Sequence, residues 1–441
     1  MDLLGKSYLF YEAQRSGKLP ANNRISYRGN SFLSDAVVGG YFDAGDHLKL
    51  NFPMHNAMII LGWSILEFPQ AHADAGQTSY ARNTLKWATD YIIACHRTRN
   101  EYVGQIGDFS GDHQYWGRPE EQTGPRPAWV WDASMPATDL LCSAASALAV
   151  AHLVYKTSDP AYSTVCLTHA EQLYALGKAK PGKYSDAYPD QTQGYTSNTY
   201  LDDLALAGAW LYKATGKQQY LADARKALQE AQYTRNPFVS WDAVFPLADL
   251  LLKSQGVANS AGVDLDWQIA HFRYSWMGKK DDGTVDPNPQ IKTTPKGLAV
   301  APLGGWGTLR YALNAAFAFV LDAKYATDSE RRAESLAFAK KQLDYALGSS
   351  GRSFVVGYGT RPPVQPHHRS ASCPDLPAPC GWDQFNSPAP NPQVLFGAMV
   401  AGPADNDGEY DDKRSDFKSN EVSLDFNAGY TGTLAGLIQM L

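Results

Sequence analysis

Residues 140–155 read LLCSAASALAVAHLVY, and this stretch decides the fold class. Its apolar side chains recur at the spacing of one helical face, at Leu141, Ala145, Leu148, Ala151 and Tyr155. An α-helix repeats every 3.6 residues, so positions three and four apart lie on the same side. The stretch therefore predicts a helix that buries an apolar stripe against its neighbours.

The same periodicity recurs along the rest of the chain. It predicts longer helices over 201–212, where Gly216 supplies a stop, over 309–320, over 336–347, where Gly348 follows, and from about Asn427 to the end. It predicts shorter helices at Met54–Leu66, Ser79–Cys95, Ala161–Gly177, Tyr220–Ala231, Phe245–Leu252 and Leu265–Trp276. Ten or more helices without a run of alternating strands have to bury their stripes against each other. A closed ring of paired helices does this within one domain.

Composition indicates a globular protein and excludes some classes of partner. Hydrophobic residues make up 44% of the 441, enough for a large core, and the net charge is −6. Lys and Arg do not cluster as a nucleic-acid footprint requires. The chain contains no run of about 18 uninterrupted apolar residues, so no membrane span is predicted. The first residues lack the basic and apolar regions of a signal peptide, so the protein is either cytosolic or its signal peptide has been removed.

The segment from Gly348 to Asn420 has almost no helical period, and ten prolines lie between Thr360 and Pro403. Loops of this length are usually functional or disordered. Disorder would leave five aromatic rings in water, so we expect an ordered loop; the rings are those of Phe354, Tyr358, Trp382, Phe385 and Phe396. Cys373 and Cys380 lie in this loop and are candidates for a small disulfide ring. The odd number of cysteines leaves at least one free, and no Cys/His spacing suggests zinc.

Three segments carry candidate chemistry. The first, GGYFDAGDH, spans 39–47 and places Asp43 and Asp46 on a tight turn. Like charges this close raise at least one pKa and can hold a shared water. The second is PHHR at 366–369, and the third spans 410–422. Taken singly, the first also fits a capped turn or a metal loop, the second a surface ion pair, and the third ordinary loop acids.

In this order the three segments resemble glycoside hydrolase family nine, a cellulase family with animal, plant and bacterial members. The resemblance runs from FYEAQRSGKLP at 10–20 to the final helix and so covers nearly the whole chain. The second family signature fits 353–369. The third fits at its expected spacings with Tyr410, Asp412, Phe417, Glu421, Ser423, Asn427 and Ala428. The opening motif most resembles the animal endoglucanases.

The resemblance implies an (α/α)6 barrel with inner and outer rings of six helices, and the helix count above agrees with it. The long loops would cover one end of the barrel and build the substrate cleft. We expect 1–441 to be a single catalytic domain, because no Ser/Thr/Pro-rich linker marks a separate carbohydrate-binding module. The implied activity is endo-acting, inverting hydrolysis of β-1,4-glucosidic bonds in cellulose or soluble β-glucan. The protein would be secreted, with its signal peptide removed, and monomeric.

The resemblance also implies the role of each acid. Asp46 is the general base that deprotonates the attacking water, Asp43 helps to hold that water, and Glu421 is the general acid. An inverting pair needs about 6.5–9.5 Å between its carboxyls, which only the fold can set here. Glu421 needs a raised pKa to stay protonated. Asp412 and Asp416 are candidates for raising it, or Asp412 orients His367 or Arg369 instead.

Sugar rings need flat apolar platforms beside hydrogen-bond donors. Family positions for this match His113 and Trp116 in DHQYWG, Trp306 in GGWG and, with a one-residue gap, Tyr195. Core packing is the alternative for each tryptophan, and a capping or core role is the alternative for His113. The family often has tyrosine five positions after the acid, where this chain has Phe426. A hydroxyl that would hydrogen-bond the base or the substrate is therefore missing.

A structural calcium ion is a further implication of the resemblance. Many family members bind calcium at positions that match Asn198, Asp202, Asp203 and Asp242, and hard oxygen ligands suit this ion. The family's usual Asp-Glu pair is Asp202–Asp203 here, so the second arm is shorter. The spacing of Thr199 and Asp202 also fits a capping box at a helix N-terminus, where acids are common.

Two other functions stay open. One is a different inverting β-glucanase, which prefers mixed-linkage glucan or glucosamine oligomers. The other is a non-catalytic carbohydrate-binding protein with a decayed site. The presence together of Asp43, Asp46, His367, Arg369 and Glu421 argues against the second.

Overall fold

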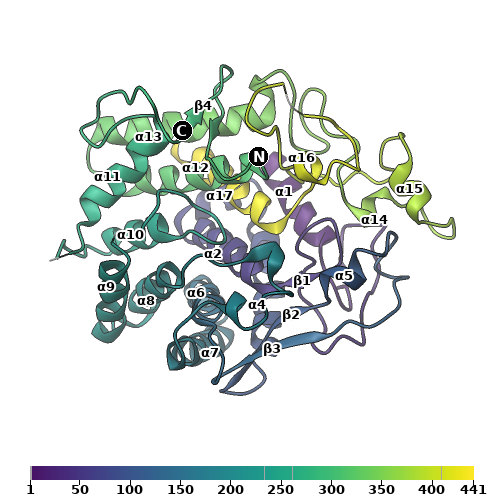
Figure 1. The fold of residues 1–441 in the computed structure, drawn as a ribbon, viewed down its shortest axis with the longest axis horizontal. Coiled ribbons are helices and arrows are strands. Elements are labelled where there is room, and N and C mark those ends of the chain that lie inside the picture. The colour runs from purple at the N-terminus through teal and green to yellow at the C-terminus, as the bar shows by residue number, and fades with distance from the viewer. Residues whose placement is uncertain (1, 233, 261, 409) are drawn as a thin grey trace.

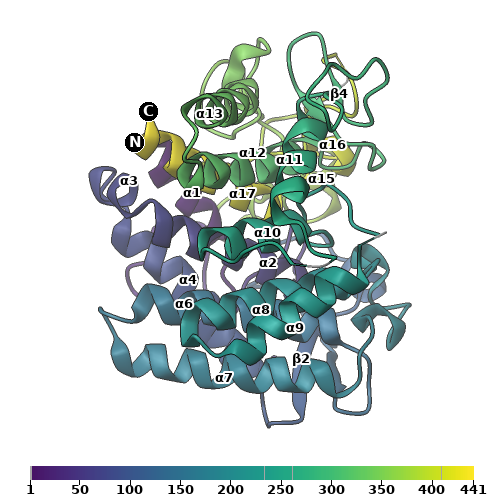
Figure 2. The same cartoon turned by 90° about the vertical axis from the view of Figure 1, so that its left-hand side faces the viewer.

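The computed structural model describes all residues except 1, 233, 261 and 409, and its body is a double ring of helices (Figure 1). Neighbouring inner helices pack against each other in a closed order: α2 (Asn51–Glu67), α6 (Thr138–Tyr155), α8 (Leu201–Thr215), α10 (Phe245–Ser254), α12 (Thr308–Tyr325), α17 (Leu424–Met440) and back to α2. Each is covered by an outer helix: α4 (Thr78–Cys95), α7 (Pro160–Ala179), α9 (Gln218–Glu230), α11 (Leu265–Trp276), α13 (Ser329–Asp344) and α1 (Asp2–Ala13), in the same order. Figure 2 shows α7 along the outside of α6. The expected (α/α)6 barrel is confirmed.

The two rings differ in burial, and the difference explains their sequences. Almost every residue of α6 is buried, because neighbours on both sides, an outer helix and the barrel centre enclose it. Such a helix is apolar all round, so the stripe seen in the sequence is only part of its buried surface. Outer α9 buries just Leu221, Ala224, Ala227 and Leu228. Helix α6 is long and apolar enough to cross a membrane, but 94% of that window is buried inside the protein.

A small antiparallel sheet was not expected from the sequence. Strands β1 (Lys49–Leu50), β2 (Glu101–Ile106) and β3 (Ala128–Asp132) pair in that order, and β4 (Lys292–Thr293) pairs with β5 (Ala299–Val300). Five of the six residues of β2 are buried, so both of its faces are covered. A strand covered on both faces shows no polar–apolar alternation, which is why periodicity did not reveal it.

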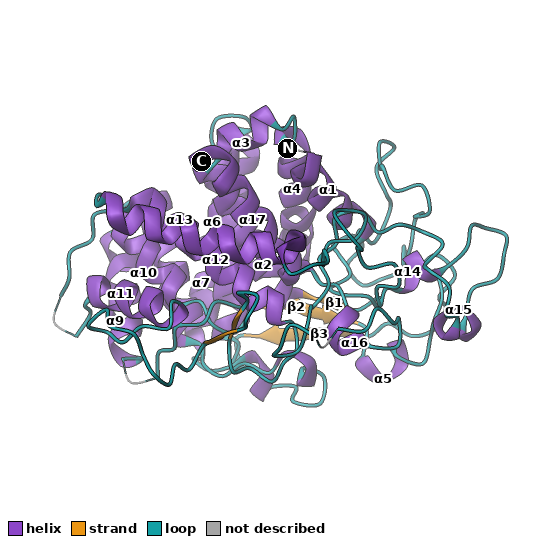
Figure 3. Ribbon diagram, turned by 90° about the horizontal axis from the view of Figure 1, so that it is seen from above, coloured by secondary structure: helices purple, strands orange, loops and turns teal. Residues whose placement is uncertain are grey.

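The long loops gather beside the helical body. Figure 3 shows the short helices α5 (Phe109–Asp112), α14 (Arg369–Ser372), α15 (Trp382–Asn386) and α16 (Phe417–Asn420) together on that side. Apart from residue 409, the segment 348–420 is ordered, as its aromatic content predicted. Buried Arg414 donates to the carbonyl oxygens of Ser387 at 2.9 Å and Ala389 at 3.0 Å.

The cysteines divide as the sequence suggested. Cys373 and Cys380 form a disulfide within the long loop. Cys95, Cys142 and Cys166 are free and buried in the helical body. The remaining short elements are α3 (Pro69–Asp74), η1 (Tyr184–Asp186), η2 (Gln193–Tyr195) and η3 (Tyr345–Ser349).

Candidate active site

The three candidate segments meet through main-chain contacts. The N–H of Arg369 donates to the carbonyl oxygen of Gly45 at 2.9 Å, and the N–H of His367 donates to that of Asn420 at 2.8 Å. His367 also forms a parallel β-bridge with Glu421. A Cβ on Gly45 would lie 2.1 Å from the carbonyl oxygen of His367, so only glycine allows this approach. The turn carrying Asp46 is thereby held directly against the segments that carry His367, Arg369 and Glu421.

Asp46 is held as an anion. One carboxylate oxygen accepts the N–H of Leu48 at 3.0 Å, and the other lies 3.0 Å from Nε2 of His113. Burial raises the pKa of Asp46, but the hydrogen bond from His113 and the charge of Arg369 outweigh burial and hold that pKa below 3.8. The same hydrogen bond raises the pKa of His113. His113 therefore acts on the predicted base itself.

The surroundings of Glu421 favour its protonated form. Burial raises its pKa well above 4.5, and the negative charges of Asp46 and Asp43 add to that shift. The raised pKa expected for the acid is thus found. It arises mainly from burial, with added contributions from the charges of Asp46 and Asp43, rather than from Asp412 or Asp416, which the sequence had suggested.

Asp412 has a different role from either one predicted. Its carboxylate accepts the N–H groups of Val364 at 2.8 Å and Gln365 at 3.1 Å, and the side-chain amide of Asn420 at 3.1 Å. It therefore holds two stretches of backbone together and does not orient a side chain of the site. His367 is oriented instead by the carbonyl oxygen of Arg414, 2.7 Å from its Nδ1.

Asp43 lies deeper than Asp46, and its pKa is shifted in the opposite direction. Burial raises the pKa of Asp43, with further contributions from the charges of Asp425 and Asp46. The hydroxyl of Tyr195 donates to its carboxylate, and the Tyr195 ring packs at 4.8 Å against Trp241. Tyr195 thus supplies a hydroxyl to this pair of acids, although Phe426 lacks one.

Two buried ion pairs were missed in the sequence. Arg369 contacts Asp112 at 2.6 Å, and Arg310 contacts Asp425 at 3.3 Å. Asp112 stands next to His113, at the end of the short α5. Its partner lies 257 positions away, and no local pattern connects the two. The buried pair fixes the guanidinium of Arg369 near Asp46.

One acidic cluster at this site could hold a metal ion. Ligand atoms of Asp46, Asp112 and His113 lie within 4.8 Å of one another. Positive charge is already present there, because Arg369 pairs with Asp112 and Arg126 lies 3.9 Å from the same side chain.

The predicted sugar platforms differ in exposure. The Trp306 side chain is 42% exposed and lies 5.4 Å from the ring of Phe417. Trp116 is only 4% exposed, donates its indole N–H to Ser372 at 2.9 Å and packs 5.1 Å from His367. Trp306 is the more exposed of the two, and its contact with a sugar stays a prediction. Trp116 is mostly covered, so its contact with substrate also stays a prediction.

The predicted calcium ligands lie together, away from Asp46 and Glu421 in the contacts they make. Asp202 and Asp203 are buried, Asp202 accepts the N–H of Val244 at 3.0 Å, and Asp242 accepts that of Asn198 at 2.8 Å. The capping-box alternative is wrong, because the helix begins after Tyr200 and the hydroxyl of Thr199 accepts the N–H of Leu201, at 3.2 Å, rather than that of Asp202.

A buried acid with a raised pKa, a second acid with a lowered pKa and exposed aromatic rings nearby define a class of protein. This is the equipment of a glycoside hydrolase, which protonates a leaving oxygen while a base activates water. Residues 1–434 match the model of glycosyl hydrolase family 9, and the chain belongs to that family.

Individual relatives agree over the whole chain. The endoglucanase of the termite Nasutitermes takasagoensis is 41% identical, with a TM-score of 0.91 over 100% of this chain and 98% of that structure. Endoglucanase CelQ of Clostridium thermocellum, solved with cellobiose and cellotriose, is 34% identical, with a TM-score of 0.87 over 99% of this chain and 70% of that structure. Endoglucanase A of Bacillus pumilus is 38% identical over 100% of this chain.

These matches make the chain an endo-β-1,4-glucanase, or cellulase, of an inverting family. Some relatives are longer. The chain spans 66% of the Bacillus pumilus protein and 42% of Endoglucanase B of Cellulomonas fimi.

Proposed function

We propose that Asp46 is the general base and Glu421 the general acid of this endoglucanase, with Asp43 helping to hold the attacking water. The assignment rests on the opposite pKa shifts of two acids in one site. His113 and Arg369 favour the ionised form of Asp46, while burial and two neighbouring acids favour the protonated form of Glu421. Acid–base catalysis needs such a split between two groups.

The neighbouring residues serve orientation. His367 and Arg369 lie on the segment that contacts both the turn of Asp46 and the segment of Glu421, so a sugar bound at these two acids would contact them. Arg369 is fixed by Asp112, and its remaining N–H groups can donate to hydroxyls. Trp306 offers a flat face for a glucosyl ring. Together these residues would bind and align a neutral sugar chain across the two carboxyls.

The stereochemistry of the product tests this assignment. A base that activates water on the face opposite the leaving oxygen yields inversion, so hydrolysis of cellohexaose should release the α-anomer first. Proton NMR during the first minutes would record it. Initial release of the β-anomer would overturn the roles given to Asp46 and Glu421. An inactive wild type would support the decayed carbohydrate-binding alternative.

We expect a bell-shaped pH profile of kcat/KM. Its acidic limb should lie below 3.8, because activity falls as Asp46 takes up a proton. Its alkaline limb should lie well above 4.5, because activity falls as Glu421 loses its proton. Replacing His113 with alanine removes the hydrogen bond that lowers the pKa of Asp46. That variant should move the acidic limb to higher pH and leave the alkaline limb in place; an unmoved acidic limb would contradict the link between His113 and Asp46.

The preferred substrate is proposed to be cellulose or a soluble β-1,4-glucan. The solved relative CelQ was crystallised with cellobiose and cellotriose, which supports this choice. Rates on carboxymethyl-cellulose, lichenan and chitosan oligomers would separate it from mixed-linkage or glucosamine substrates. We further propose that residues 1–441 act as one monomeric catalytic domain and that the protein is secreted. The Cys373–Cys380 disulfide supports secretion, because such bonds persist in oxidising compartments.

We also propose that Asp202, Asp203, Asp242 and Asn198 hold a structural calcium ion. Burial raises the pKa of Asp202 to about 8 and that of Asp242 to about 6, and one oxygen of Asp202 is buried without a partner. Asp139, whose pKa burial raises to about 7, adds a fourth acid to the group. Among the described residues, no lysine or arginine forms an ion pair with these four aspartates. An ion bound by carboxylate oxygens would supply the missing positive charge.

Removing calcium should therefore destabilise the protein. We expect chelation by EDTA to lower Tm by about 5 °C, and added calcium to restore it more fully than magnesium. Calcium binding should release protons between about pH 6 and 8, because the ligands must ionise. Differential scanning calorimetry and a pH-indicator titration would measure both effects. The Asp202→Asn variant should lose the response, and Asp266→Asn, at an exposed acid paired with Lys253, should keep it.

A further inference from the structure

An exposed tryptophan stands on the long loop outside the residues assigned so far. Trp382, the first residue of α15, has 47% of its surface exposed. Large aromatic side chains bury more apolar surface than any other type. An exposed ring therefore forgoes this stabilisation unless a partner covers it. Among the described tryptophans, only Trp267 and Trp306 are comparably exposed. Trp306 is already a candidate sugar platform, and the similar exposure of Trp382 raises the question of what covers it.

Ring-to-ring contacts connect Trp382 with the catalytic residues. Its ring lies 6.0 Å from that of Trp116, which lies 5.1 Å from that of His367. The ring of Phe385 contacts both tryptophans, at 4.7 Å from Trp116 and 5.3 Å from Trp382. Trp382 is therefore two ring contacts away from His367, which forms a β-bridge with Glu421. It is the exposed member of a group whose other members are largely covered.

A second group of rings continues from His367 in another direction. The Phe417 ring lies 6.1 Å from His367 and 5.4 Å from Trp306. Helix α15 lies farther from the helical body than α16, which carries Phe417 (Figures 1 and 3). The rings thus form a chain of contacts from Trp306 through Phe417, His367 and Trp116 to Trp382. Both ends of this chain are exposed tryptophans, and its middle member, His367, forms a β-bridge with Glu421.

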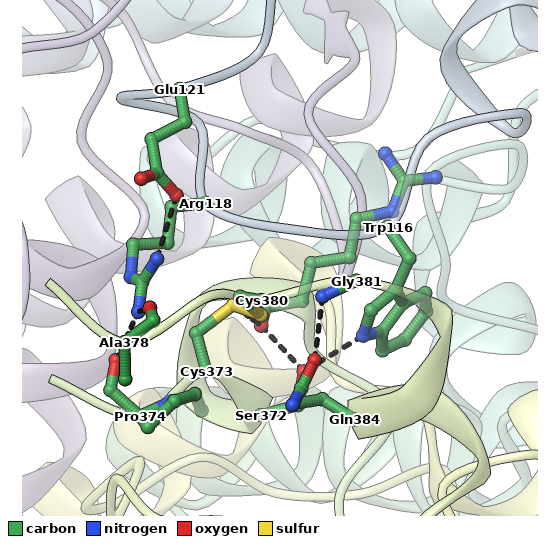
Figure 4. Close-up of a disulfide and its surroundings, with 12 residues drawn as sticks. Trp116, Arg118, Glu121, Ser372, Cys373, Pro374, Ala378, Cys380, Gly381 and Gln384 are labelled. Carbon is green, nitrogen blue, oxygen red and sulfur yellow. Dashed lines mark hydrogen bonds and ion pairs between the residues drawn. A yellow bond between two sulfur atoms is a disulfide. The ribbon is translucent and has the colours of Figure 1, made fainter. Parts of the chain in front are cut away.

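The loop that carries Trp382 is fixed rather than free. The Cys373–Cys380 disulfide closes the turn just before it, and Arg118 donates to the carbonyl oxygen of Ala378 at 2.8 Å and also to that of Pro374 (Figure 4). On its far side, Arg414 donates to the carbonyl oxygens of Gln384 at 2.6 Å and Phe385 at 3.2 Å. Both arginines are at least 95% buried.

Two buried cations therefore bond to main-chain carbonyls of one surface loop. Each is costly to bury, and each gives up water for those bonds. The result is a tryptophan whose position is set before any ligand arrives. A platform fixed in advance loses little entropy on binding, which favours affinity.

We propose that Trp382 is the platform of a distal glucan-binding subsite of this endoglucanase. Its occupant is a glucosyl unit of the chain being cut, beyond the units that reach Asp46 and Glu421. The flat apolar face of a β-1,4-linked glucose ring matches the indole face, and its neutrality means that no counter-charge is needed. Long chains would cover Trp382, and short oligosaccharides bound at the acids would not reach it.

Chain-length dependence tests the proposal. Trp382→Ala should lower kcat/KM on cellohexaose by about tenfold and lower it much less on cellotriose. Trp382→Phe should recover part of the loss. Trp267→Ala is the matched control, because Trp267 is 45% exposed but lies on the outer helix α11, stacked on His271. It should behave as wild type on both substrates.

Binding separates the subsite from damage to the catalytic residues. In a Glu421→Gln background, calorimetry should show weaker cellohexaose binding on adding Trp382→Ala and a smaller change for cellotriose. Replacing Cys373 and Cys380 together with serine should act in the same direction, since it frees the loop. Equal losses on both sugars would indicate a structural role and overturn the proposal. So would unchanged cellohexaose kinetics, or an effect seen only in adsorption to insoluble cellulose.

Discussion

Replacing Glu421 with glutamine should lower kcat on cello-oligosaccharides by about 10³-fold, within the range that general acid catalysis contributes. Glutamine keeps the size of the side chain and can still hydrogen-bond, but it has no proton to give to the leaving oxygen. The raised pKa of Glu421 shows what is lost, because burial and the charges of Asp46 and Asp43 keep that proton in place. Initial rates of reducing-end release would measure the change, with KM little altered.

The loss should depend on the leaving group. An aryl β-cellobioside whose phenol departs without protonation should lose far less activity in Glu421→Gln than cellohexaose does. Asp411→Asn is the matched control, because Asp411 is an acid of the same loop that is exposed and paired with Lys413. It should keep wild-type rates on both substrates. Similar losses on both substrates in Glu421→Gln would mean that Glu421 is not the acid.

The barrel could be predicted because its helices carry local signals. The 3.6-residue period in 140–155 is visible without knowledge of any partner, and glycines such as Gly216 mark the ends. The buried strand β2 could not be found this way. Covered on both faces, it shows no alternation, and its pairing with β3 is a contact between segments that the chain brings together only on folding.

The site divides in the same manner. Asp43, Asp46 and Glu421 were found because their segments resemble ordered family motifs. Asp412 was found for the same reason, but its function was misjudged, since hydrogen bonds to the backbone of Val364 and Gln365 leave no trace in a motif. Motif position thus located the acids, and only the folded contacts separated the acids proposed to be catalytic from the structural Asp412.

Replacing Asp46 with asparagine should also lower kcat by about 10²–10⁴-fold, because the amide cannot take a proton from water. Its oxygen can still accept the N–H of Leu48, so the turn should keep its shape. Glu421→Gln should keep part of its activity on the aryl β-cellobioside. Asp46→Asn should lose that activity, because every productive attack needs the base. The acidic limb of the pH profile should disappear together with the group that sets it. Stopped assays of both substrates across pH would record this pattern.

The Asp43→Asn variant tests whether Asp46 or Asp43 is the base. It is buried with a raised pKa and accepts a hydrogen bond from Tyr195, so it carries less negative charge than Asp46 in the resting site. Asp43→Asn should therefore cost less activity than Asp46→Asn, and its acidic limb should remain. If Asp43→Asn instead removed that limb and the larger share of kcat, Asp43 would be the base. Asp46, hydrogen-bonded to His113, would then be the carboxylate that only positions the water.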